Sequence, residues 1–239
     1  MAKKINVNTV FNSESMLLSK KSPFSVQEAY KTLRTNVSFS LPGNECKVIG
    51  IVSAKRSEGK SSVSINLAIS FAQLQKRVLI IDGDMRLPTI AAKLRIATNK
   101  GLSNYLAGNV TEIPIQHIDE RNLDIITSGN IPPDSTTLLE SDQMANLIEQ
   151  LKEEYDYIII DLPPITVVSD AAILSKLIDG FLLVVRHNWS EMSKIDETLR
   201  QLRFADAKVI GFVYNGKSSE NKYYKKRGYY SSDYYYKKS

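Results

Sequence analysis

Residues that could hold a phosphate group stand together in the stretch AKRSEGKSS, residues 54–62. Four residues separate Ala54 from the run Gly59-Lys60-Ser61, which is the spacing of a phosphate-binding loop (P-loop) with alanine in place of its first glycine. In such a loop, backbone N–H groups and the positive end of the next helix surround the phosphates. The lysine contacts the β- and γ-phosphates, and the serine hydroxyl binds Mg²⁺. The stretch therefore predicts ATP as ligand and Mg²⁺ as cofactor, with contacts from Ser57, Glu58, Gly59, Lys60, Ser61 and Ser62.

Three aspartates follow two apolar runs and could serve the same ligand. Asp82 and Asp84 end the run VLIIDGD, and Asp161 ends YIIID. If these runs are parallel strands, their carboxyl ends form the edge of the sheet where ligands bind. We expect Asp84 and Asp161 to hold Mg²⁺ through bound water, and Lys60 and Arg86 to stabilise phosphate charge. A strand-end aspartate that only caps a turn is the alternative for each one taken singly.

The elements that must position these residues alternate along the chain. Short apolar runs predict strands at 47–54, 77–84, 123–129, 155–163, 180–186 and 208–215, and their continuity indicates burial on both faces. Helical stretches lie between them at 61–75, 137–155, 170–178 and 191–202, and a first helix begins with the capping-box pair Ser25 and Glu28. This order predicts the α/β fold of a P-loop NTPase, a doubly wound and mostly parallel sheet flanked by helices. We expect a polar arm at 1–23, one domain at 24–216 and a disordered tail at 217–239.

The tail differs from the rest of the chain in charge and in aromatic content. It carries seven cationic and two acidic residues, leaving 24 of each sign in the first 216 residues, so the net charge of +5 belongs to the tail. Seven of the twelve tyrosines lie in it, without aliphatic neighbours that could bury them: Tyr223, Tyr224, Tyr229, Tyr230, Tyr234, Tyr235 and Tyr236. Lysines among aromatic residues also suit single-stranded nucleic acid, but the balanced charge of the body argues against it, and we expect no nucleic-acid partner.

The remaining composition indicates a cytoplasmic protein. The single cysteine, Cys46, excludes an internal disulfide. The start of the chain lacks the apolar core of a signal peptide, and no apolar stretch reaches the length needed to cross a bilayer. Any attachment to a membrane is therefore expected to depend on a partner.

The P-loop, the Asp-x-Asp pair and Asp161, in this order and with a tyrosine-rich C-terminus, resemble the bacterial tyrosine kinases of capsule and exopolysaccharide operons. The likeness covers nearly the whole chain and includes the segments QEAYKTLRTN, GLSNYLAGN, TSGNIPPDSTTLLES and IIIDLPPITVVSDA. The chain is most similar to the Gram-positive form, in which the kinase is a separate polypeptide. The resemblance implies a protein-tyrosine kinase domain at 24–216 whose product regulates polysaccharide synthesis and export.

The resemblance also implies substrates, partners and roles. The tyrosines of the tail are expected to be phosphorylated in trans by a neighbouring subunit, and a cognate phosphatase is expected to reverse this. A membrane-anchored co-polymerase would recruit the kinase to the inner membrane face, and its cytoplasmic tail would complete the active site. Asp82 is the candidate acceptor of the phenolic proton, and Asn215 stands where related ATPases read the adenine, although a turn-favouring asparagine is an equal alternative. Trp189 is expected to pack.

The helix at 24–41 is implied to assemble a ring of subunits. The family uses the motif Glu-x-x-Arg-x-x-Arg, and Glu28, Lys31 and Arg34 occupy its positions on one helix face. Lys31 offers a point charge where the family has the planar fork of arginine. Further departures are Ser57, where many P-loops have glycine, and Leu87, where the family often has a second arginine.

One departure supports a rival function. Lys55 lies four residues before Gly59, as in the cell-division and chromosome-partition ATPases, which use this lysine across a dimer. The alternative to a kinase is therefore a partition-type ATPase switch of the same superfamily. The tyrosine-rich tail and the helix that carries Glu28 favour the kinase.

Overall fold

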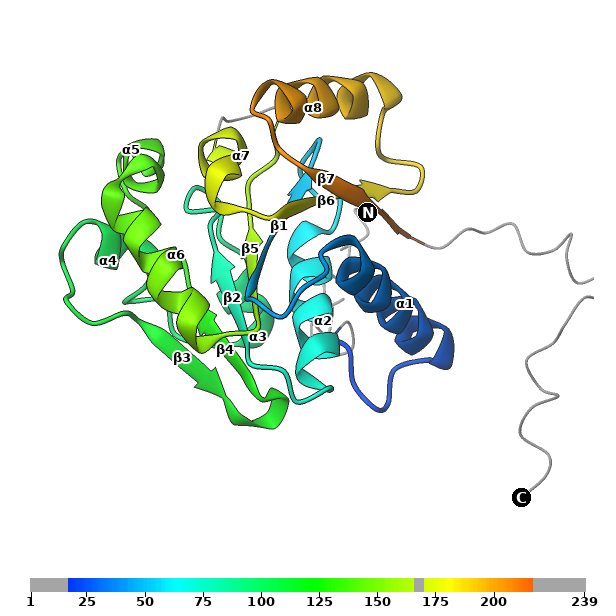
Figure 1. The fold of residues 1–239 in the computed structure, drawn as a ribbon, viewed down its shortest axis with the longest axis horizontal. Coiled ribbons are helices and arrows are strands. Elements are labelled where there is room, and N and C mark those ends of the chain that lie inside the picture. Colours follow the sequence, from blue (N-terminus) through cyan, green and yellow to red (C-terminus); the bar gives the residue numbers. More distant parts are fainter. Residues whose placement is uncertain (1–16, 166–169, 217–239) are drawn as a thin grey trace, which may run out of the picture.

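The computed structural model describes residues 17–165 and 170–216, and in them the chain forms a seven-stranded β-sheet (Figure 1). The strands are β1 (Lys47–Ser53), β2 (Val78–Asp82), β3 (Ile115–Ile118), β4 (Leu123–Ile126), β5 (Tyr157–Asp161), β6 (Gly180–Arg186) and β7 (Val209–Asn215). They lie in the order β3-β4-β2-β5-β1-β6-β7, and only the pairing of β3 with β4 is antiparallel. The predicted α/β fold with a mostly parallel sheet is confirmed.

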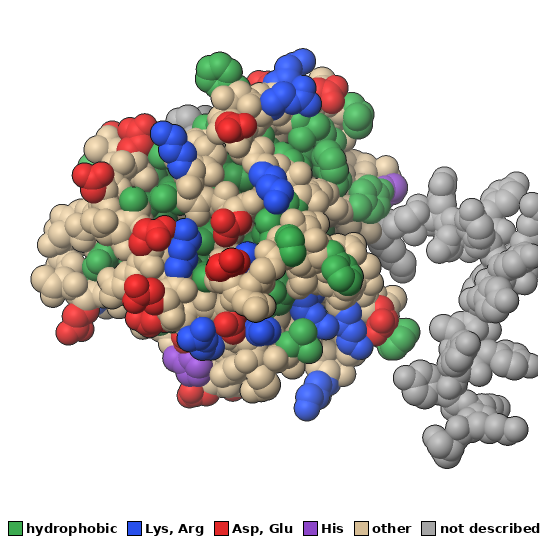
Figure 2. Space-filling model, in the orientation of Figure 1, with side chains coloured by type: hydrophobic (Ala, Val, Ile, Leu, Met, Phe, Trp, Pro, Cys, Tyr) green, Lys and Arg blue, Asp and Glu red, His purple; other side chains and the backbone are tan. Residues whose placement is uncertain are grey.

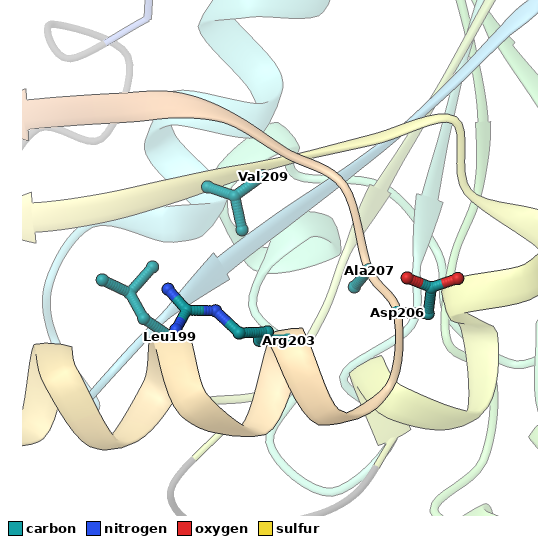
Figure 3. A pocket seen from close by; sticks show the side chains of 5 residues that line it. All are labelled: Leu199, Arg203, Asp206, Ala207 and Val209. Carbon is teal, nitrogen blue, oxygen red and sulfur yellow. The ribbon is translucent and has the colours of Figure 1, made fainter.

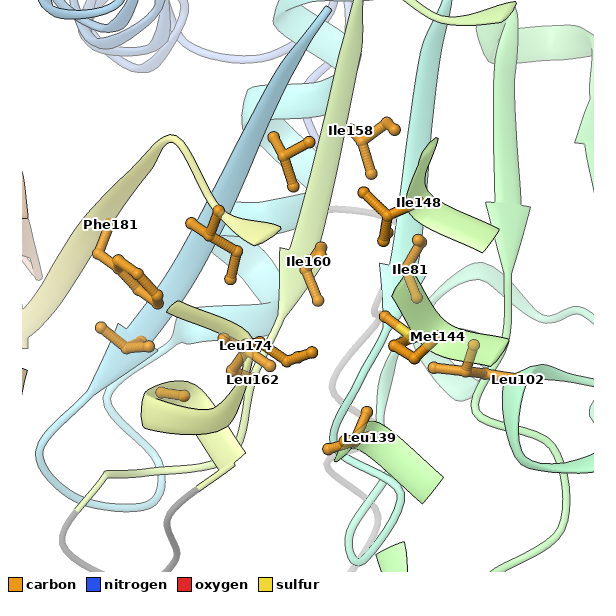
Figure 4. Close-up of a cluster of buried hydrophobic side chains, with 14 of the residues drawn as sticks. Ile81, Leu102, Leu139, Met144, Ile148, Ile158, Ile160, Leu162, Leu174 and Phe181 are labelled. Atoms are coloured by element: carbon orange, nitrogen blue, oxygen red, sulfur yellow. The ribbon is translucent and has the colours of Figure 1, made fainter. Parts of the chain in front are cut away.

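Helices cover both faces of the sheet, as Figure 1 shows. They are α1 (Phe24–Ser40), α2 (Lys60–Ala72), α3 (Ile90–Leu94), α4 (Leu102–Leu106), α5 (Ser135–Glu140), α6 (Asp142–Glu154), α7 (Asp170–Ile173) and α8 (Met192–Phe204), with 3₁₀ turns η2 (Asp119–Arg121) and η3 (Leu174–Leu177). One apolar core joins the strands to α1, α2 and α3. The other joins them to α4 through α8, with Ile81, Met144 and Ile160 at its centre (Figure 4). Two covered faces explain why the central strands read as continuous apolar runs.

Several element boundaries differ from the sequence prediction. The expected capping box is wrong, because α1 begins at Phe24 after Pro23 and has no side-chain cap, which places Ser25 inside the helix. The helix expected at 137–155 is two helices, since Ser141 has extended backbone and its hydroxyl accepts the Met144 N–H to cap α6. Strand β3 was not predicted. Its four residues, IQHI, are only partly buried at the sheet edge and lack a long apolar run.

The two ends of the described chain also depart from expectation. Leu17 and Leu18, within the expected polar arm, are buried, and the Leu18 N–H donates to Asn66 Oδ1 of α2 at 2.7 Å. At the other end, β7 is an edge strand, so Phe212 and Tyr214 are 54% and 59% exposed instead of covered. The tail at 217–239 lies outside the described residues.

The surface is mixed in charge. Figure 2 shows acidic and basic side chains interspersed over the face that is drawn, in line with the balanced charge of the first 216 residues. None of the helices described is both long and apolar enough to span a membrane.

Candidate active site

The P-loop connects β1 to α2, and its backbone depends on two left-handed residues. Gly59 precedes α2 with φ 96°, a conformation that residues with a side chain rarely adopt, and a Cβ atom there would also displace the Asn215 amide group. Ser57 has φ 64°, a conformation that glycine adopts far more readily than serine. Ser57 thus keeps the backbone geometry of a glycine at the position where the sequence departs from many P-loops.

Lys60 and Asp84 face each other across the mouth of this loop. The Lys60 Nζ lies 3.8 Å from Asp84 Oδ2, and both side chains are about nine-tenths buried. The other oxygen of Asp84 accepts the Leu87 N–H at 3.1 Å. Lys60 lines the same cavity as the loop residues, so a phosphate that enters it would meet the positive charge of the lysine.

Asp82 and Asp161 are direct neighbours at the ends of the paired strands β2 and β5. Both side chains are almost fully buried. Asp82 Oδ2 accepts the Ile90 N–H at 3.2 Å and Asp161 Oδ1 accepts the Ser64 hydroxyl at 3.0 Å. The remaining oxygen of each carboxyl group, Oδ1 of Asp82 and Oδ2 of Asp161, has no hydrogen-bond partner. Buried carboxyl oxygens without a hydrogen-bond partner are uncommon in proteins, and such atoms are suited to binding a cation.

This environment changes how the two carboxyl groups ionise. Burial, and next the negative charge of Asp161, raises the pKa of Asp82 to about 8, although the Ile90 N–H acts in the opposite direction. Burial also raises the pKa of Asp161, against the lowering effects of Lys60, Ser61 and Ser64. A divalent cation would remove the repulsion that both groups experience.

The donor set fits Mg²⁺. Magnesium prefers oxygen ligands, keeps several waters, and is usually bound by one or two protein groups together with phosphate oxygens. The Ser61 hydroxyl, the unpartnered Oδ2 of Asp161, and Asp84 supply such atoms. Within the part of the chain that is described, no group of three acidic, histidine or cysteine side chains could hold a metal by itself.

A cavity of about 280 Å³ opens beside the P-loop. Its lining residues are Arg56, Ser57, Glu58, Gly59, Lys60, Ser61, Ser62, Asp84, Leu87, Thr89, Lys93 and Pro164. The structure thus brings the predicted loop residues and Asp84 to one cavity, with Asp82 and Asp161 buried and absent from its lining. Thr89 and Lys93 were not predicted. The Thr89 hydroxyl donates to Ser61 Oγ at 2.7 Å, but no motif in the sequence marks either residue.

Two predicted site residues contact protein groups instead of lining this cavity. The Arg86 guanidinium donates to Thr136 Oγ1 at 2.9 Å and lies 3.5 Å from the buried Asp170. Burial raises the pKa of Asp170 even though Arg86 lowers it. The Asn215 amide donates to the Glu58 carbonyl at 2.8 Å, which ties the end of β7 to the P-loop. Neither Thr136 nor Asp170 was singled out in the sequence.

The three residues of the expected assembly motif lie on α1 but do not act alike. Lys31 and Glu28 form an exposed ion pair of 2.7 Å. Arg34 turns inward and donates to the Ser70 carbonyl at 2.5 Å and to its hydroxyl at 3.3 Å. Arg34 therefore joins α1 to α2 within the subunit.

A second cavity, of about 260 Å³, lies between α8 and β7 and is lined by Leu199, Arg203, Asp206, Ala207 and Val209 (Figure 3). No predicted site residue lines it. Asp82, Asp84, Asp161 and the P-loop residues are not among the residues that line it.

Comparison with known proteins agrees with this geometry. The family model ParA, described as NUBPL iron-transfer P-loop NTPase, matches residues 45–232. The septum site-determining protein MinD of Pyrococcus horikoshii, solved with Mg-ADP, is 26% identical with a TM-score of 0.60, over 73% of this chain and 72% of that one. Fold and site thus define a ParA-like P-loop NTPase.

Proteins with higher sequence identity to this chain identify its family within the P-loop NTPases. The tyrosine-protein kinase YwqD of Bacillus subtilis is 37% identical over 208 residues, which is 86% of each chain. The kinase domain of the Escherichia coli tyrosine kinase ETK is 33% identical with a TM-score of 0.79, over 85% of this chain and 83% of that one. The chain belongs to the bacterial tyrosine kinases, and it is a protein-tyrosine kinase.

Proposed function

We propose that this kinase uses Mg·ATP to phosphorylate the tyrosines at 223–236 of a neighbouring copy, and that this controls the synthesis and export of a capsular or exopolysaccharide. The observation that carries the proposal is the pair of buried carboxyl groups with free oxygens beside a complete P-loop. The seven phosphoacceptor residues are the tail tyrosines named from the sequence, and they lie outside the described residues.

The proposed reaction requires the protein mainly to position the two reactants and to stabilise the negative charge of the phosphates. The phenolic oxygen attacks the γ-phosphorus, the bond to the β,γ-bridging oxygen breaks, and ADP leaves. Lys60 and the loop N–H groups of Ser57 to Ser62 hold the phosphates, and the Ser61 hydroxyl, Asp84 and Asp161 would hold Mg²⁺ directly or through water. When bound, Mg²⁺ neutralises charge on the β- and γ-phosphates.

We assign the phenolic proton to Asp82. With a pKa of about 8, its ionised form is a stronger base than an ordinary carboxylate, and the positive charge of bound Mg²⁺ would favour that ionised form. Because its side chain is fully buried, transfer passes through one water molecule from the cavity side. Asp84, which lines the cavity, shares the role of holding Mg²⁺ with Asp161. Arg86 acts from its contact with Thr136 and Asp170 by adding positive charge near the site.

We further propose partners and a location. The kinase domain forms only part of the E. coli relative, since this chain spans 31% of that polypeptide. We infer that a membrane-anchored co-polymerase supplies the corresponding segments here, that its cytoplasmic tail completes the nucleotide site, and that it recruits the kinase to the inner membrane face. Assembly into a ring through Glu28, Lys31 and Arg34, adenine contact by Asn215, and a cognate phosphatase belong to the same proposal.

Lys55 gives little support to the partition-type switch. Its ammonium group pairs with Glu191 of the same subunit at 2.7 Å and lies 5.4 Å from the Trp189 ring. It is thus engaged inside the subunit.

A mixing experiment tests phosphorylation in trans. One partner is the full chain with Lys60→Met, which offers tail tyrosines without activity. The other is an active chain in which the seven tail tyrosines are phenylalanine. Incubation with Mg·ATP and the co-polymerase tail should place phosphate on the Lys60→Met chain only when both are present. If wild-type chains label themselves at a rate independent of concentration, and the mixed sample stays unlabelled, the reaction occurs in cis.

A further inference from the structure

The end of β6 and the turn that follows it contact the first half of the P-loop. Arg186, the last residue of β6, donates from Nη1 to the Ser57 carbonyl at 2.7 Å, and the indole N–H of Trp189 in the following turn donates to the Arg56 carbonyl at 3.1 Å. The Arg186 guanidinium carbon lies 5.7 Å from the centre of the Trp189 ring, so the two side chains also contact each other. Two successive carbonyl groups of the loop are therefore held by side chains from a segment about 130 residues away.

A buried carboxylate completes this connection. The Glu58 side chain is fully buried, and its Oε2 accepts the Lys55 N–H at 2.9 Å. Its Oε1 accepts the hydroxyl of Ser190, and that hydroxyl accepts the Arg186 N–H at 2.7 Å. A continuous chain of hydrogen bonds thus runs from the backbone of Arg186 to the backbone of Lys55.

These contacts surround Ser57, the residue of the loop whose backbone conformation is unfavourable for its residue type. Ser57 has a left-handed backbone, which is unfavourable for a residue with a Cβ atom. Glycine would adopt it without help. The carbonyl that Arg186 holds belongs to Ser57 itself, and Glu58 is the next residue.

We propose that Arg186, Ser190 and Glu58 are positioning residues for nucleotide binding, which hold Ser57 in its left-handed conformation and so keep the loop N–H groups directed at the phosphates. They act through the loop backbone and need no contact with the nucleotide. The inference rests on the nucleotide site proposed above. It also explains how the chain can carry serine at position 57.

A double-mutant cycle separates this role from a general effect on folding. Isothermal titration calorimetry with Mg·ADP measures the dissociation constant of the wild type, Arg186→Ala, Ser57→Gly and the double variant. Loss of the charged hydrogen bond should weaken Mg·ADP binding about tenfold in the serine background. In the Ser57→Gly background the same substitution should cost less than about twofold, because glycine keeps the conformation unaided. Arg200→Ala, an exposed arginine on α8, is the matched control and should bind like the wild type.

Two further measurements sharpen the result. Ser190→Ala should raise the KM for ATP with kcat nearly unchanged, and Ser190→Thr, which keeps the hydroxyl, should restore it. Trp189 is the only tryptophan, so its emission should change when Mg·ADP binds. Equal loss of affinity from Arg186→Ala in both backgrounds would overturn the positioning role while leaving the nucleotide site intact. Absence of Mg·ADP binding by the wild type would overturn the nucleotide site and this inference together.

Discussion

At the scale of single residues, the site is organised around two buried carboxyl groups whose surroundings disfavour their charged form. Asp82 and Asp161 are paired neighbours on adjacent strands, and each keeps one buried oxygen without a partner. An arrangement of this kind is costly in the free protein and is stabilised by a bound cation. These carboxyl groups would therefore be stabilised by the Mg²⁺ that accompanies ATP.

The first prediction concerns Asp82→Asn. At neutral pH the ligand-free Asp82 is mostly protonated, and asparagine has its shape and can still accept the Ile90 N–H, so the fold should be kept. Because asparagine cannot take up the phenolic proton, phosphotyrosine formation should fall at least about 100-fold, in line with the loss of a general base. Quantitative phosphotyrosine detection and Mg·ATP calorimetry check this. A parallel loss of ATP affinity would show that Asp82 serves binding and not proton transfer.

The second prediction concerns pH. The pKa of Asp82 rises from 3.8 to about 8 on folding, so between these values the folded state binds more protons than the unfolded state. The stability of the ligand-free protein should therefore fall as pH rises from about 4 to about 8. Thermal melting should show Tm of Asp82→Asn exceeding that of the wild type by at least about 3 °C at pH 8 and by less at pH 5. A difference that grows toward low pH would contradict the raised pKa.

Residue types and spacing predicted the P-loop and the three aspartates because the reaction restricts both. The same reasoning missed Thr89, Thr136, Asp170 and Ser190. Their hydroxyl and carboxyl groups act through contacts between segments distant in sequence, such as Arg86 with Asp170 and Glu58 with Ser190. Common residue types in such pairs leave no local pattern. Trp189 was expected to pack, yet it is 47% exposed and binds the P-loop through its indole N–H.

At the scale of elements, α1 is held to the domain by Arg34. The guanidinium reaches two atoms of Ser70 in α2, whereas Lys31 makes only an exposed ion pair with Glu28 on the same helix. Arg34 therefore links α1 to α2, whereas Lys31 makes a contact only within α1.

The third prediction follows from this difference. Arg34→Ala should lower the free energy of unfolding by about 1–2 kcal/mol, because it removes charged hydrogen bonds that are partly buried. Lys31→Ala, the matched control, should change it little, since exposed ion pairs contribute little. Urea unfolding of both variants gives the comparison. If the two substitutions prove equally harmless, Arg34 has no structural role and is available to a neighbouring subunit.

The sequence predicted central elements better than peripheral ones. Strands β1, β2 and β5 are buried on both faces, and their apolar runs mark them clearly. Strand β3 is short and only partly buried, so its residues carry no such signal. The break at Ser141 was missed because the apolar spacing of 137–155 continues across it, and only the serine cap ends the preceding helix.

At the scale of the whole molecule, strand order is what assembles the site. Strand β5 lies between β1 and β2, so the P-loop, Asp161 and the Asp82/Asp84 pair emerge side by side at the carboxyl edge of the sheet. The motifs predicted that these groups belong to one site. They did not predict that β5 lies between β1 and β2, because strand order depends on contacts across the whole chain. For the same reason the sequence did not reveal that β7 is an edge strand.

Exposed hydrophobic side chains lie on β7 and on the neighbouring helix α8. Met192 and Phe204 of α8, and Phe212 and Tyr214 of β7, are all largely exposed, and Figure 2 shows hydrophobic side chains in this part of the face. The tail at 217–239 continues from the end of this strand.

The central claim is that the tail is the substrate of this kinase, and mass spectrometry tests it most directly. Purified protein is incubated with Mg·ATP, with and without the cytoplasmic tail of the co-polymerase, and phosphate is located residue by residue. Lys60→Met, which removes the ammonium group beside Asp84, is the control. The account predicts phosphate on tyrosines between Tyr223 and Tyr236 in the wild type and none in the control. ATP hydrolysis with an unmodified tail, even with the co-polymerase segment present, would contradict it.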